Sequence, residues 1–102
     1  MAAYMIVTAR VIDRERFISG YAKAAAELVA RFGGRYVLRA PGALALEGGF
    51  GEGASVVISE WPDRAQALAF WNSPEYAAAK RLREGLAEVQ VVLVEAPAMG
   101  EE

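Results

Sequence analysis

The sequence predicts an α+β fold, a βαββαβ sandwich in which one antiparallel sheet carries its helices on a single face. Segments with strand-like and helix-like patterns alternate in the order strand, helix, strand, strand, helix, strand. The same Asp-Arg pair, Asp13-Arg14 and Asp63-Arg64, occurs at the start of the predicted helical segment in each half of the chain. This repetition indicates two repeated units. The length of 102 residues suits one domain. We expect that domain to span residues 1–97, with 98–102 as a flexible C-terminal tail.

The first half begins with a strand over residues 4–11, which is rich in β-branched and aromatic side chains. Its odd positions are apolar, whereas its even positions mix apolar and polar groups, as on a face that lines a pocket or meets a partner sheet. Asp13 is expected to cap a helix over 14–32. Phe17 and Tyr21 begin an apolar stripe along this helix, which Gly33-Gly34 ends.

Residues 35–39 predict a short second strand by simple alternation. This alternation places Tyr36 and Leu38 on one face and Arg39 on the other. Pro41-Gly42 interrupts the strand.

The segment from 43 to 53 has two parts. Residues 43–47 are expected to resume as a bulged or separate strand, and residues 48–53 form a loop with four glycines. The loop is either a long hairpin connection or a flexible flap over a pocket, with Phe50 as its apolar tip.

The second half predicts a central strand over 55–61, helices capped by Asp63 and Ser73, and a last strand over 89–95. Trp61 is expected at the rim of the sheet or at a dimer seam, and Gly85 is expected to end the second helix. Right-handed crossovers then give a ferredoxin-like sandwich whose other sheet face has no cover. A homodimer through that open sheet face is the economical arrangement.

The amino-acid composition excludes several classes of function. The chain has no His and no Cys, which removes the thiol nucleophile, the imidazole base and the usual ligands for transition metals, so no metal or cofactor is expected. A net charge of −2 with scattered basic residues predicts no nucleic-acid binding. The absence of a long apolar run predicts no membrane span, and a cytoplasmic location is expected.

Glu47 is the candidate catalytic residue, because a carboxylate that ends an apolar strand can act as a general base if burial raises its pKa. The alternative is a solvated charge. Arg39 and Arg83 are candidates for holding a ligand carboxylate. Arg83 can instead pair with Glu75 or Glu84 on the surface, and Arg10 is a further candidate of the same type.

Trp71 and Tyr76 complete the candidate ligand-binding set, with Phe50 on the flap. They can form an aromatic wall in which the Tyr76 phenol donates a hydrogen bond. Aromatic residues at helical spacing can equally be plain core.

These residues resemble domain-of-unknown-function family 1330, small bacterial proteins of the dimeric α/β-barrel type. The resemblance rests on Trp71-Asn72-Ser73-Pro74-Glu75-Tyr76 followed by Leu82-Arg83, with support from Gly33-Gly34-Arg35-Tyr36 and Leu46-Glu47-Gly48. It implies the homodimer and no established activity.

The wider superfamily includes cofactor-independent monooxygenases, whose pattern usually has a histidine before Ser-Pro, where this chain has Phe70-Trp71. The resemblance therefore does not imply a histidine-dependent activity, and haem ligation through imidazole is excluded.

Two hypotheses about the function are open. The pocket between sheet and helices performs acid/base chemistry on a small acidic or aromatic metabolite, or the protein is a non-catalytic ligand-binding or assembly module.

Overall fold

The computed structural model describes residues 1–97, so the predicted tail lies outside the described residues. Four strands, β1 (Ala2–Val11), β2 (Arg35–Ala40), β3 (Ser55–Trp61) and β4 (Ala87–Ala96), form one sheet in the order β2-β3-β1-β4. All neighbouring strands are antiparallel, and β3 is central as predicted. This is the ferredoxin-like α+β arrangement that the order of elements predicts.

The first helical segment is continuous but not uniform. It consists of α1 (Arg14–Arg16), a π-helix η1 (Phe17–Ala22) and α2 (Lys23–Arg31), where the sequence predicts one regular helix. Asp13 caps it as expected, since its Oδ1 accepts a hydrogen bond from the Arg16 N–H at 3.2 Å. A π-turn widens the helix and is often found at functional sites.

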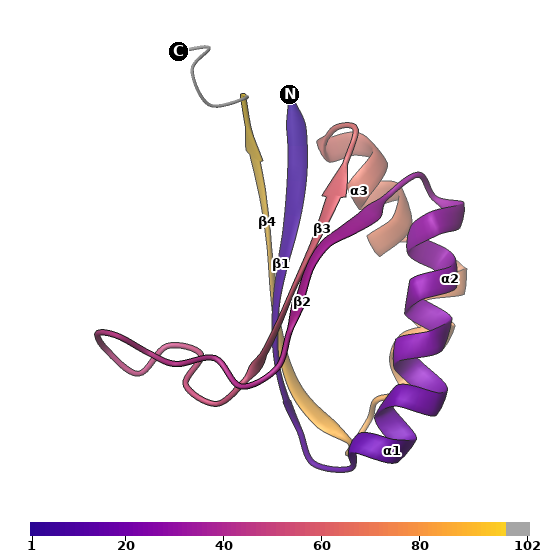
Figure 1. The fold of residues 1–102 in the computed structure, drawn as a ribbon. Coiled ribbons are helices and arrows are strands. Elements are labelled where there is room, and N and C mark those ends of the chain that lie inside the picture. Colours follow the sequence, from indigo (N-terminus) through magenta and orange to yellow (C-terminus); the bar gives the residue numbers. More distant parts are fainter. Residues whose placement is uncertain (98–102) are drawn as a thin grey trace.

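The second helical layer consists of α3 (Arg64–Trp71) and α4 (Pro74–Arg81). Asp63 accepts from the Gln66 N–H at 2.8 Å, and Ser73 Oγ accepts from the Tyr76 N–H at 3.0 Å. Both predicted caps are therefore confirmed. The sequence predicted that this helix ends at Gly85. Helix α4 instead ends at Arg81, and turns occupy residues 82–86. All helices lie on one side of the sheet (Figure 1).

Trp61 lies in the core, not at the rim or a dimer seam. It is 1% exposed and is the largest fully buried side chain. Its Nε1–H donates to Ser59 Oγ at 2.9 Å, and its ring lies 4.9 Å from that of Phe70. The physical reason is its odd position on β3, which points it toward the helices at the end of the sheet that α3 covers.

Strand β2 departs from simple alternation. Tyr36 pairs with Ser59 and Leu38 pairs with Ile58, so Val37 is an extra residue, a β-bulge. The bulge places Tyr36 and Arg39 on the helix side of the sheet and Leu38 on the other side, where the sequence predicted Tyr36 and Leu38 together.

Residues 43–47 form no strand, contrary to the prediction. The hydrogen-bond ladder from β2 and β3 ends at Ala43, which exchanges bonds with Ala54 and Gly53. Beyond it the chain projects from the sheet as a loop (Figure 1), which we call the 41–54 loop. Leu46 is 91% exposed, so the alternating leucines bury nothing that would favour a strand.

Candidate functional site

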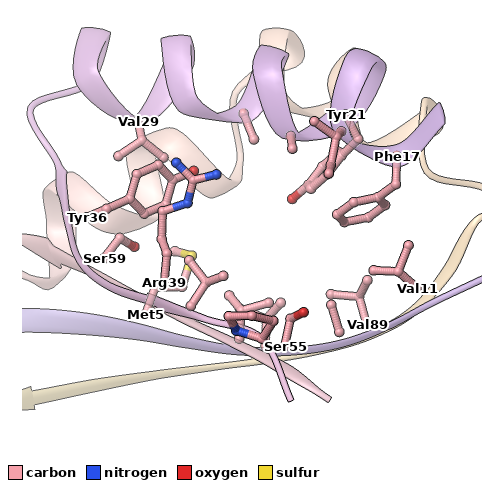
Figure 2. A pocket seen from close by; sticks show the side chains of 18 of the residues that line it. Met5, Val11, Phe17, Tyr21, Val29, Tyr36, Arg39, Ser55, Ser59 and Val89 are labelled. Atoms are coloured by element: carbon pink, nitrogen blue, oxygen red, sulfur yellow. The ribbon is translucent and has the colours of Figure 1, made fainter. Parts of the chain in front are cut away.

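A cavity of about 450 Å³ lies between the first helical segment and the sheet, and we call it the helix–sheet cavity (Figure 2). Its floor is formed by side chains of β1, β3 and β4, namely Met5, Val7, Ala9, Val57, Val89 and Val91. Its roof is formed by residues of η1 and α2, namely Phe17, Ile18, Tyr21, Ala22, Ala25 and Val29.

The empty space has a simple cause in the sequence. Large side chains, including Trp61 and Phe70, fill the end of the sheet under α3. At the other end, Ala9, Ala22 and Ala25 face the space between sheet and helix, and their methyl groups cannot reach across it. The rings of Phe17 and Tyr21 project from η1 into this space, and their centroids are 5.2 Å apart (Figure 2).

The mouth of the cavity is cationic. Arg14 and Arg39 both line it and both are exposed, so their charged ends lie at the opening. The Arg39 guanidinium lies 5.4 Å from the centroid of the Tyr36 ring (Figure 2). Burial raises the pKa of the Tyr36 phenol, which therefore stays protonated. Within residues 1–97, no Asp or Glu lines the cavity, and neither arginine is part of an ion pair.

One corner of the cavity holds a polar cluster of two phenols and a guanidinium. The Tyr21 and Tyr76 hydroxyls are 2.6 Å apart, within hydrogen-bond distance. Arg83 Nη1 donates to the Tyr21 oxygen at 3.1 Å and more weakly to the Tyr76 oxygen at 3.4 Å. Burial, followed by the neighbouring Tyr21, raises the pKa of Tyr76, so its phenol stays protonated at neutral pH.

A family model described as a domain of unknown function, DUF1330, matches residues 2–97. The chain belongs to this family. The predicted resemblance is thus confirmed over almost the whole chain, whereas none of the curated proteins compared with it matches.

Solved structures similar to this DUF1330 chain share its fold. The RPA0582 protein of unknown function from Rhodopseudomonas palustris has a TM-score of 0.75 at 20% identity, covering 94% of this chain and 82% of that one. SnoaB, a cofactor-independent oxygenase from Streptomyces nogalater, has 0.69 at 19% identity, covering 99% and 98%. A Bacteroides fragilis protein, described as dimeric with a ferredoxin-like fold, has 0.55 at 16% identity, covering 93% and 96%. At these identities the likeness shows the fold alone.

The DUF1330 structure brings some of the predicted site residues together. Arg39 and Tyr76 line the helix–sheet cavity, and Arg83 contacts it through the Tyr21 and Tyr76 hydroxyls. Among the described residues, Arg83 forms no ion pair with Glu75 or Glu84, the alternative that the sequence left open.

Other predicted site residues lie elsewhere. Trp71 lines a separate groove between α4 and β4, where the Lys80 ammonium lies 4.4 Å from its ring centroid. Glu47 and Phe50 lie on the 41–54 loop, are exposed, and do not line the helix–sheet cavity. Arg10 also faces away, since its Nη1 donates to the Glu52 carbonyl at 2.6 Å.

Sequence reasoning missed Phe17, Tyr21 and Tyr36 as site residues. It assigned the first two to a core stripe, and it did not identify the bulge that brings Tyr36 beside Arg39. A signal was present in the stripe itself, because Phe17 and Tyr21 are followed by alanines, including Ala22 and Ala25, that are too small to fill the space beside the rings.

Residues 1–97 contain neither a membrane-spanning helix nor a cluster of metal-binding side chains. No helix among them has the length and apolar character needed to cross a membrane. No group of three or more His, Cys, Asp or Glu side chains within that range is arranged to hold a metal ion.

Proposed function

We propose that the helix–sheet cavity binds a small, largely apolar aromatic molecule that carries a carboxylate or a similar anionic oxygen. One observation carries this proposal. An apolar cavity of about 450 Å³ is lined by two exposed arginines, Arg14 and Arg39, and by no carboxylate among residues 1–97. That volume lies within the range of about 300–1,000 Å³ that is typical of small-ligand pockets.

The walls of the cavity suit the apolar part of the proposed ligand. The floor is aliphatic, and the roof presents the Phe17 and Tyr21 rings, tilted by 43° to each other. An aromatic ring that enters this space buries apolar surface and meets ring edges and faces at favourable offset angles.

The anionic part is matched by the mouth. A guanidinium is always charged and recognises a carboxylate with two parallel N–H donors. Arg39 is held beside Tyr36 by its contact with the ring, and no acidic side chain of the described chain competes for it. An incoming anion would therefore be its charged partner.

Binding is favoured over proton transfer, the other hypothesis from the sequence. The cavity offers phenols and guanidinium groups, and the raised pKa of Tyr76 keeps that phenol from acting as a base near neutral pH. Glu47 as a general base would require another subunit to carry the 41–54 loop to the cavity. The family and fold comparisons are consistent with either hypothesis.

We also infer that two copies associate through the open sheet face, as the sequence predicted. An apolar row crosses all four strands on this face. It consists of side chains that the strand register places opposite one another, namely Leu38, Ile58, Ile6 and Val92. No helix covers this face in the described chain (Figure 1). The dimeric description of the Bacteroides fragilis protein supports the same arrangement here.

Titration with 2-naphthoate and with its neutral amide, 2-naphthamide, tests the binding proposal. Wild-type protein should bind the carboxylate more tightly, and Arg39→Met should weaken its binding about tenfold while changing amide binding little. Arg31→Met is the matched control, because Arg31 is exposed on α2 and does not line the cavity. Equal affinities for both compounds, or no binding of either, would contradict the proposal.

A further inference from the structure

We propose that the Tyr21 hydroxyl is a preorganised hydrogen-bond donor for an acceptor oxygen of the cavity's ligand, and that Tyr76 and Arg83 position it. This inference rests on the proposed ligand-binding function and deepens it. It assigns to the ligand a carbonyl-type or phenolate oxygen that the Tyr21 hydroxyl recognises.

The cluster of Tyr21, Tyr76 and Arg83 shares a fixed number of protons. Arg83 Nη1 can only donate, and its shorter contact, 3.1 Å, is to the Tyr21 oxygen. The 2.6 Å contact between the phenols contains one proton, so one of the two hydroxyls donates to the other. The remaining phenolic proton must find an acceptor elsewhere, and the direction of the Tyr–Tyr bond decides which phenol carries it.

Burial decides the direction. Tyr76 is 2% exposed, and within residues 1–97 its hydroxyl contacts only Tyr21 and Arg83. If Tyr21 donated to Tyr76, the buried Tyr76 proton would have no acceptor, which costs about 1–3 kcal/mol. If Tyr76 donates to Tyr21, every buried group is satisfied. The raised pKa of Tyr76 agrees with its role as a protonated donor.

The free proton then belongs to Tyr21, and it faces the cavity. Tyr21 is only partly buried, and its hydroxyl points into the open space below η1 (Figure 2). Its acceptor must lie there, which is solvent in the free protein and a ligand oxygen in the complex.

The surroundings make Tyr21 a strong and fixed donor. An oxygen that accepts two hydrogen bonds, one of them from a cation, polarises its own O–H bond. The ring is held from three sides, by Phe17 at 5.2 Å, by Tyr76 at 6.3 Å and by the Arg83 guanidinium at 5.0 Å between centres. Little freedom is therefore lost when the hydroxyl engages an oxygen.

Solution NMR tests the direction without any ligand. With ring-¹³C-labelled tyrosine, the protected hydroxyl proton should correlate with the Tyr76 ring and should disappear in Tyr76→Phe. Correlation of the protected proton with the Tyr21 ring would overturn the proposal whether or not a ligand binds.

Binding of 1-indanone and indane tests the consequence, because the two differ by one carbonyl oxygen and neither is charged. Wild-type protein should prefer the ketone, and Tyr21→Phe should lower that preference about tenfold, by weakening indanone binding more than indane binding. Tyr76→Phe and Arg83→Met should lower it to a smaller extent. Tyr4→Phe is the control, since the Tyr4 hydroxyl donates to Glu60 on the open sheet face.

The outcomes separate the two proposals. An unchanged ketone preference in Tyr21→Phe, with 2-naphthoate still bound through Arg39, would overturn the role of Tyr21 alone. Failure of naphthoate, indanone and indane to bind would overturn the proposed function, and the NMR result would then decide the direction of the hydrogen bond by itself.

Discussion

At the scale of single residues, close contacts in the core fix the elements that frame the cavity. Ser73 is one example, because its Oγ accepts from the Tyr76 N–H and donates to the Phe70 carbonyl at 2.8 Å. This one side chain joins the end of α3 to the start of α4 and so fixes the backbone position of Tyr76. The sequence indicated the cap through Ser73-Pro74, but not its second bond.

Gly34 is the tightest of these positions. A Cβ added there would lie 2.8 Å from the Trp61 ring, closer than side chains pack. Gly34→Ala should therefore lower the free energy of unfolding by about 1–3 kcal/mol, measured by urea denaturation. Gly20→Ala is the matched control, because nothing lies within 4 Å of its added Cβ, and it should not destabilise. Equal stability of the two variants would contradict this packing.

At the scale of elements, the sequence predicted what depends on local patterns. Strand order, helix positions and the caps at Asp13, Asp63 and Ser73 follow from periodicity and turn chemistry, and the structure confirms them. The π-turn of η1 and the bulge at Val37 were not predicted, because each depends on how an element fits its neighbour and not on its own sequence.

These two irregularities account for most of what was missed in the candidate site. The bulge brings Tyr36 to the same side of the sheet as Arg39, and η1 carries Phe17 and Tyr21. Arg39 and Tyr76 were predicted as ligand-binding residues from residue type and from their places on a predicted strand and helix, and both line the cavity. The roles proposed for them stay predictions, as do those for Glu47 and Phe50 on the 41–54 loop.

A charged contact joins three strands on the open sheet face and makes stability depend on pH. Glu60 on β3 accepts from Arg35 Nε on β2 at 2.8 Å and from the Tyr4 hydroxyl on β1 at 2.9 Å. The Arg35 bond and then the Tyr4 bond lower the pKa of Glu60 below its ordinary value of 4.5. The ionised carboxylate therefore stabilises the fold fully above about pH 4.5, and this contribution is lost as pH falls through the lower folded-state pKa.

Glu60→Gln should accordingly be less stable than wild type at pH 7, and the difference should shrink on acidification below pH 4.5. Urea midpoints at a series of pH values measure it. Glu88→Gln controls for a general loss of negative charge, because Glu88 is exposed and has no ion pair among residues 1–97. A difference that grows on acidification would show that the pKa shift has the opposite sign.

At the scale of the whole molecule, the described chain is a thin slab. Its principal extents are 42 × 37 × 16 Å, the thickness of one sheet and one helical layer. The uncovered sheet face includes Val92 at 53% exposure and Val94 at 41%. A single domain of this size gains most by covering such a face with a second copy.

Val92→Glu tests this association. Val92 lies on the edge strand β4, at one end of the apolar row, and a charge placed there would face the partner sheet without an opposite charge, so the dimer should dissociate to a monomer in sedimentation equilibrium at tens of micromolar protein. Ala78→Glu adds the same charge on the exposed side of α4 and should leave the dimer intact. A wild-type monomer, or a Val92→Glu dimer, would contradict the proposed interface.

We propose above that the helix–sheet cavity is a binding site for an aromatic anion. A crystal structure of the wild-type protein with 2-naphthoate tests it most directly. We expect the naphthyl ring to lie between Phe17 and the strand floor, with its carboxylate within hydrogen-bond distance of the Arg39 guanidinium. Naphthoate seated on the open sheet face or in the groove beside Trp71, with the helix–sheet cavity empty, would contradict it.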